Sequence, residues 1–175
     1  MSDISATRPR QRGAAERTGA AGEPHRPSRA SDLAYGAFYG GALGGSVIAL
    51  YFLIADAILG QALYTPSLLG TALFLDTTTT VVRTDMVALF SIVHFVAFFA
   101  LGGVASWLHL TWKPLRHRMA SLGVVLFVLL TGALFLGDWL VMDGVVRALG
   151  VFEVLLANAI TATAMAAFIT RTLPG

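Results

Sequence analysis

Four stretches of the chain are long enough to cross a lipid bilayer and carry almost no charge. They cover about residues 36–60, 86–110, 120–141 and 146–170. A helix of about 20 apolar residues spans the hydrocarbon core of a bilayer, and it satisfies its backbone hydrogen bonds within one segment. The sequence therefore predicts an all-α integral membrane protein, a four-helix bundle formed by residues 34–175.

The composition indicates that a bilayer is the solvent of this chain. Of the 175 residues, 56% are hydrophobic and 13% are charged, and the mean hydropathy is +0.73. A soluble domain is about one quarter charged. The chain contains no cysteine, which excludes disulfides, thiolate metal sites, iron–sulfur ligation by this chain and cysteine nucleophiles.

Residues 1–33 differ from the rest, because they are rich in Ala, Gly, Ser, Pro and Arg and contain almost no large apolar residue. Such a segment buries too little surface to fold alone, and we predict a disordered basic tail. Six of the twelve Lys and Arg residues lie there. The pI of 9.4 is therefore a property of the tail, and we expect no nucleic-acid partner. The arginines either attract anionic lipid head groups, at about 1 kcal/mol each, or only fix the orientation.

The distribution of positive charge predicts the orientation of the bundle. Ten of the twelve Lys and Arg residues lie in the tail, in the second connection or at the C-terminus, and the other two are Arg83 and Arg147. Cytoplasmic segments carry the excess of Lys and Arg. We therefore expect a bacterial inner (cytoplasmic) membrane protein with both termini in the cytoplasm. Asp3, Glu16 and Glu23 disfavour the alternative for the tail, an organelle transit peptide.

The first connection contains a further short apolar segment. Thr65 suits the N-cap of a helix, and Pro66 suits its first position. The apolar residues that follow, Leu68, Leu69, Ala72, Leu73 and Leu75, predict a helix too short to span. It lies either in the outer interface or against the bundle, and residues 76–85 return in an extended form. A selectivity loop is the alternative function of this connection.

Small residues form a stripe on the first predicted helix. Its glycines recur at helical spacing, and two more occur in the second helix: Gly36, Gly40, Gly41, Gly44 and Gly45, with Gly102 and Gly103. Small side chains let helix backbones approach each other within a membrane, where no hydrophobic force drives association. We predict helix packing. A phosphate-binding loop would require a preceding strand.

One ionisable residue lies in each predicted span. They are Asp56, His94, Asp138 and Glu153. Counted from the ends of the spans, all lie roughly 4 to 13 Å from the outer boundary. Each costs about 2.5–3.5 kcal/mol in lipid unless it is paired. We therefore expect His94 and Glu153 to approach each other, together with Asn158, and Asp56 and Asp138 to lie nearer to water.

This polar cluster has two interpretations. It forms a site for protons, a cation or a polar solute, with His94 titrating near neutral pH, or it only fixes the register of the helices. No H-x-x-x-H or E-x-x-H spacing indicates a metal site. His94 and His109 lie on the same span and no other span carries a histidine, so a bis-histidine haem is not expected. No motif predicts a catalytic residue or a cofactor.

Three segments resemble a group of uncharacterised bacterial integral membrane proteins with four transmembrane helices. They are "TPSLLGTALF", "VHFVAFFALGG" and "NAITATAMAAFITRTLP". The shared T-P-x-x-L-G, H-x-x-x-F-x-x-x-G and N…M…P motifs fall on these residues: Thr65, Pro66, Leu69 and Gly70; His94, Phe98 and Gly102; Asn158, Met165 and Pro174. The resemblance covers residues 38–174. It implies the four-helix fold and no established activity.

These observations predict a non-enzymatic protein. Short connections, small packing faces and the absence of motif chemistry favour an accessory subunit of a larger membrane complex, for example of respiratory or photosynthetic type. Its partners would be the lipid bilayer and other membrane subunits. The alternative is a self-contained carrier or sensor of protons or a small polar solute that uses the polar cluster. A membrane-embedded enzyme is the third hypothesis.

Overall fold

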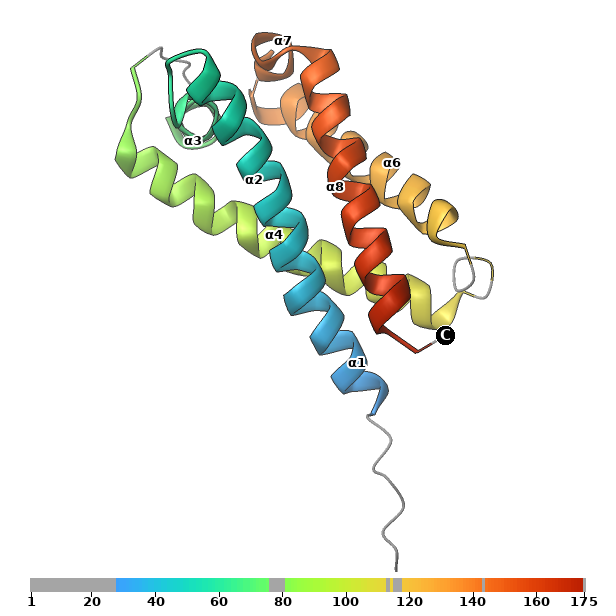
Figure 1. Cartoon of the computed structure of the whole chain (residues 1–175). Helices are drawn as coiled ribbons and strands as arrows, with labels where there is room; N and C mark the ends of the chain where they lie inside the picture. Colours follow the sequence, from blue (N-terminus) through green and yellow to red (C-terminus); the bar gives the residue numbers. More distant parts are fainter. Residues whose placement is uncertain (1–27, 76–80, 113, 115–117, 143, 175) are drawn as a thin grey trace, which may run out of the picture.

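Figure 1 shows the computed structural model of the chain, in which long helices form a bundle. The structure describes residues 28–75, 81–112, 114, 118–142 and 144–174. Within these ranges all regular elements are helices, and four helices are long and apolar enough to cross a membrane. The predicted class, an all-α multi-pass membrane protein, is confirmed. Residues 1–27 of the predicted tail and residues 76–80 of the predicted extended return lie outside the described residues.

The first spanning helix begins earlier than predicted. It runs without a break through α1 (Arg29–Tyr35), the π-helix η1 (Gly36–Gly40) and α2 (Gly41–Ile58). Ser28 caps it, because its hydroxyl oxygen accepts a hydrogen bond from the Ser31 backbone N–H at 3.2 Å. Asp32 adds a negative group to the first turn, which the helix dipole favours. The boundary placed between residues 33 and 34 is therefore wrong, since the last five residues of the predicted tail are helical.

The other elements follow the predicted order. They are α3 (Tyr64–Leu75), α4 (Thr84–Thr111), α6 (Met119–Gly137) with its π-helical end η2 (Asp138–Met142), α7 (Val145–Leu149) and α8 (Val151–Thr172). The predicted fourth span, 146–170, is divided in the structure. Gly150 has a φ of 86°, a conformation that glycine adopts without steric cost, and it separates α7 from α8.

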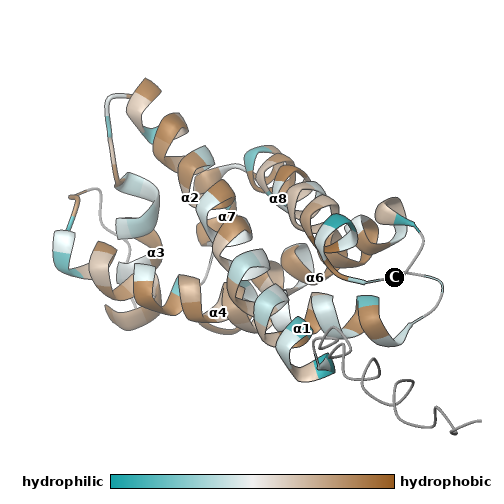
Figure 2. Cartoon of the chain, turned by 60° about the horizontal axis from the view of Figure 1, so that its bottom comes forward, coloured by the Kyte–Doolittle hydropathy of each residue, from teal (hydrophilic) through white to brown (hydrophobic). Residues whose placement is uncertain are grey.

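The long helices form two pairs. The first spanning helix packs on α4, α6 packs on α8, and α2 also contacts α8, whereas α4 and α6 barely touch. In Figure 1, α3 and α7 lie at the end of the bundle that is remote from α1 and the C-terminus. Figure 2 shows hydrophobic residues along the long helices. Many of their side chains are exposed, among them Ile54, Ile92 and Val124. This is the surface expected of helices surrounded by lipid.

The first helix and α4 cross in backbone contact. A Cβ atom placed on Gly41 would lie 2.5 Å from the carbonyl oxygen of Phe98, and one on Gly102 would lie 2.6 Å from the Gly41 nitrogen. Neither position has room for a methyl group. The glycines therefore set the distance between the two helices, because main chain meets main chain there.

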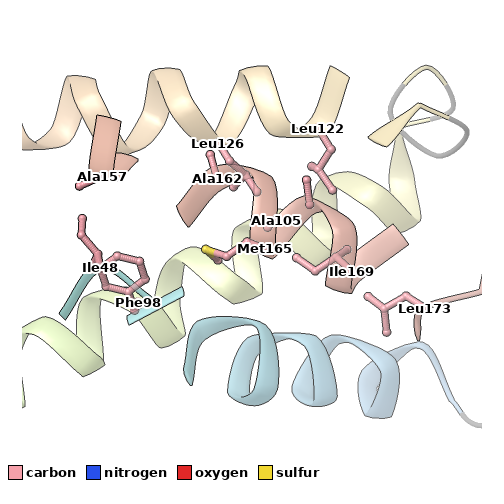
Figure 3. Packing of buried hydrophobic residues seen from close by; sticks show 11 residues of the cluster. Ile48, Phe98, Ala105, Leu122, Leu126, Ala157, Ala162, Met165, Ile169 and Leu173 are labelled. Carbon is pink, nitrogen blue, oxygen red and sulfur yellow. The ribbon is translucent and has the colours of Figure 1, made fainter. Parts of the chain in front are cut away.

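The opposite edge of the glycine stripe faces α8. A Cβ on Gly44 would overlap the side chain of Met165, and one on Gly40 would lie 3.5 Å from Cγ1 of Ile169. Met165 and Ile169 are fully buried. Figure 3 shows both among the core side chains, together with Leu122 and Leu126 of α6. The stripe is thus occupied by α4 on one side and by α8 on the other.

The remaining glycines of the predicted set also lie at helix contacts. Gly36 faces the Ser106 side chain, and a Cβ on Gly45 would lie 3.0 Å from the ring of Phe95. A Cβ on Gly103 would lie 3.5 Å from Cβ of Ala37, which is an ordinary contact. Gly103 is therefore the member of the set with the most room beside it.

The crossing predicts a large effect from one methyl group. Gly41→Ala should lower the free energy of unfolding in detergent by about 1–3 kcal/mol, because the Phe98 main chain must move to admit the new Cβ. The matched control is Gly132→Ala on α6, where an added Cβ would meet no described atom within 4 Å. It should leave stability within about 0.5 kcal/mol. Equal melting temperatures of the two variants would contradict the crossing.

Candidate functional site

Asp56 holds the short helix α3 in place. It is 5% exposed near the end of α2. Its Oδ2 accepts a hydrogen bond from the Thr65 backbone N–H at 2.7 Å, and its Oδ1 accepts one from Thr65 Oγ1 at 2.7 Å. The first N–H groups of a helix have no partner within the helix, and Asp56 supplies one. The predicted role of Thr65 as the N-cap is therefore wrong, because α3 begins at Tyr64 and Asp56 provides the cap.

Asp138 makes the equivalent contact at the third connection, between α6 and α8. It lies where α6 passes into η2, and its Oδ1 accepts a hydrogen bond from the Val146 backbone N–H at 3.0 Å, in the first turn of α7. The two short helices then share a buried apolar cluster that includes Leu68, Leu69 and Ala72 of α3 and Val145 of α7. Of the two predicted positions for the short helix, the structure shows the one against the bundle.

His94 lies on the face of α4 that meets α2. Its Nε2 is 3.0 Å from the carbonyl oxygen of Gly45. A carbonyl can only accept, so Nε2 carries the hydrogen, and Nδ1 of the neutral ring is an acceptor. The ring lies among Phe90, Phe95 and Phe98, with centroid distances of 5.6, 5.4 and 4.7 Å.

Glu153 and Asn158 bond to other helices than the predicted ones. The Tyr51 hydroxyl donates to Oε2 of Glu153, which links α2 to α8 at the surface. Asn158 is buried, and its Nδ2 donates to Thr131 Oγ1 at 3.2 Å, which links α8 to α6.

The expected pairing of His94 with Glu153 does not occur among the hydrogen bonds of the described residues. The reason is the start of α8. The sequence predicted a span that begins at residue 146, with Glu153 well inside it. In the structure, Gly150 interrupts the helix, so that Glu153 lies in the first turn of α8 and is exposed. The five residues of the predicted polar cluster therefore lie at separate contacts: His94, Glu153, Asn158, Asp56 and Asp138. Within the described ranges no group of three His, Asp or Glu side chains could hold a metal ion.

A cavity of 920 Å³, which we call the wedge cavity, separates the two helix pairs. Its walls come from α2 and α4 on one side and from α6 on the other, with Asn158 of α8 and part of α3. The lining is mainly apolar. The polar side chains on it are Ser46, Thr65, Ser91, His94 and Asn158. The sequence indicated His94 and Asn158 but not the cavity, because its existence depends on the angle between the helix pairs.

Comparison with protein-family models, curated proteins and solved structures found no match. The resemblance to uncharacterised four-helix membrane proteins therefore stays a prediction. Several of its motif residues lie at internal contacts, although Pro174 is exposed. Thr65 bonds to Asp56, His94 bonds to Gly45, and Gly102 lies at the backbone crossing. An added Cβ on Gly70 would lie 2.6 Å from the carbonyl oxygen of Met86. In this chain, these residues therefore contribute to helix packing and to the hydrogen bonds between helices.

The contacts of Asp56 predict a stability effect confined to one end of the bundle. Asp56→Ala should lower the free energy of unfolding by about 2 kcal/mol and speed hydrogen exchange of the α3 amides, because Thr65 loses both hydrogen bonds. Thr65→Val removes only the hydroxyl contact and should have about half the effect. Unchanged exchange in α3 of Asp56→Ala would show that the carboxyl group does not hold this helix.

Proposed function

We propose that this protein is a non-enzymatic accessory subunit that packs against a larger membrane complex, for example of respiratory or photosynthetic type. The observation that supports it is a second groove, which we call the small-residue groove, between the start of the first helix and α4. It has a volume of 590 Å³. Its walls carry Ala30, Ala34, Ala37, Ala100 and Gly103, with Phe99 and Trp107 beside them.

This groove suits an apolar transmembrane helix of a partner. Small residues on both walls allow a second backbone to come close, and close packing is what holds helices together in lipid. The chain itself uses the same device where Gly41 meets Gly102. The glycines of the stripe on the first helix contact other helices inside the bundle. Gly103 of α4 has more room beside it, because an added Cβ would meet only Cβ of Ala37.

The alternative function, a carrier or sensor of protons or a small polar solute, has less support from the contacts. It requires His94, Glu153, Asp56 and Asp138 to act as one cluster. Asp56 and Asp138 bind helix N-termini, Glu153 binds Tyr51 and His94 binds Gly45. Each polar group therefore has a structural partner of its own.

We place the protein in the bacterial cytoplasmic membrane with both termini in the cytoplasm. The excess of Lys and Arg supports this orientation, since ten of twelve belong to the N-terminal tail, the second connection or the C-terminus. At the opposite end, Arg83 forms an ion pair with Asp85 at 2.6 Å, in which both side chains are exposed. Hydrogen bonding to this carboxylate raises the pKa of the Arg83 guanidinium, which keeps its charge.

Gly103→Leu tests the subunit role. The leucine side chain should fill the small-residue groove, while the bundle folds normally because a Cβ at Gly103 meets only Cβ of Ala37, at 3.5 Å. The amount of the variant that is found in the complex should be at least ten-fold lower than that of the wild type. It is measured by gentle extraction of native membranes, native separation of the particles and peptide sequencing. Abundance in the membrane should stay near that of the wild type.

Gly132→Leu is the matched control, because it adds the same side chain at an open position of α6. It should remain in the complex. Two results would contradict the proposal: wild-type protein that migrates alone, or Gly103→Leu that migrates with the same partners as the wild type.

A further inference from the structure

We propose that the wedge cavity binds a lipid-soluble aromatic alcohol of the quinol class, whose hydroxyl donates a hydrogen bond to Nδ1 of His94. This site goes beyond the proposed subunit role. It adjoins the small-residue groove on α4, where Ala100 and Val104 line both. Its support comes from the size of the cavity, the aromatic rings around His94 and the hydrogen-bonding state of the polar lining.

The size and shape fit a small organic molecule. Ligand sites in proteins have volumes of about 300–1,000 Å³, lie between the helices of bundles and combine apolar walls with a few polar groups. The wedge cavity, at 920 Å³, is within this range. Several lining residues are exposed, among them Val93 at 40% and Leu129 at 39%. A molecule dissolved in the bilayer can therefore enter from the side.

Aromatic side chains surround the polar group. Phe90, Phe95 and Phe98 line the cavity and also contact the His94 ring, and Phe52 of α2 lines it too. Aromatic rings pack well against one another in offset or edge-to-face geometry. A flat ring is thus a better match for this part of the cavity than a saturated acyl chain.

His94 presents a hydrogen-bond acceptor to the cavity, whereas Thr65 and Ser91 beside it use their hydroxyl hydrogens within the protein. Thr65 donates its hydroxyl hydrogen to Asp56, Ser91 donates to the carbonyl oxygen of Val87 at 2.7 Å, and His94 uses Nε2–H for Gly45. Nδ1 of His94 has no hydrogen-bond partner among the residues that the structure describes. A ligand that donates a hydrogen bond satisfies this atom, whereas a quinone, which only accepts, does not.

The test uses the full chain in phosphatidylcholine nanodiscs, with a short-chain benzoquinol and the corresponding quinone as probes under anaerobic conditions. Native mass spectrometry measures the bound fraction. The quinol should bind at least five-fold more tightly than the quinone, which is the ratio that corresponds to one net hydrogen bond of about 1 kcal/mol. In His94→Phe, which keeps an aromatic ring and removes the acceptor, this preference should disappear.

A second pair of variants distinguishes loss of the binding site from loss of the fold. Ala97 lies in the cavity lining on the exposed side of α4. Ala97→Phe should weaken quinol binding at least ten-fold, while the control Ala88→Phe, which is also exposed on α4 and lies outside the lining, should bind as the wild type does. Three results would overturn the site: equal affinity for quinol and quinone, full binding by Ala97→Phe, or phospholipid that the quinol does not displace.

Discussion

The approach of two glycine backbones determines the architecture of this protein. In lipid, side chains gain nothing from leaving water, so helices associate through close packing. Gly41 and Gly102 provide it by bringing main chain against main chain. Because α2 is anchored to α4 at this point and to α8 along its other edge, the first helix joins the two helix pairs. The wedge cavity lies between α4 and α6, which barely touch.

The polar groups are used to close connections. Asp56 and Asp138 occupy equivalent positions, each near the end of a spanning helix, and each satisfies an N–H group in the first turn of the next short helix. The residues that donate these hydrogen bonds, Thr65 and Val146, flank the buried cluster between α3 and α7. A polar group that would be costly in lipid is thus placed where a helix terminus needs an acceptor. His94 differs from the aspartates because it has one ring nitrogen left over within a cavity.

The fold was predictable because bilayer thickness and backbone hydrogen bonding leave few alternatives to four helices. The glycine spacing likewise indicated a packing face on the first helix. The pairing of His94 with Glu153 could not be predicted reliably, because it required the start of α8, and Gly150 resembles an ordinary glycine of an apolar run. For Asp56, the sequence predicted only its depth in the membrane. Its partner Thr65 follows nine residues later, and their hydrogen bonds can be predicted only when the turn that joins α2 to α3 is known. The wedge cavity depends on helix angles, which no local pattern encodes.

Oxidative cross-linking of Ala37→Cys with Gly103→Cys tests the helix crossing most directly. The natural chain has no cysteine, so any disulfide reports this pair. A Cβ on Gly103 lies 3.5 Å from that of Ala37, within the range that a disulfide requires. The account predicts nearly complete intramolecular cross-linking in membranes under mild oxidant, and none for Ala37→Cys with Gly132→Cys. Absence of the first cross-link, with both thiols intact after denaturation, would contradict the crossing on which the two proposed sites depend.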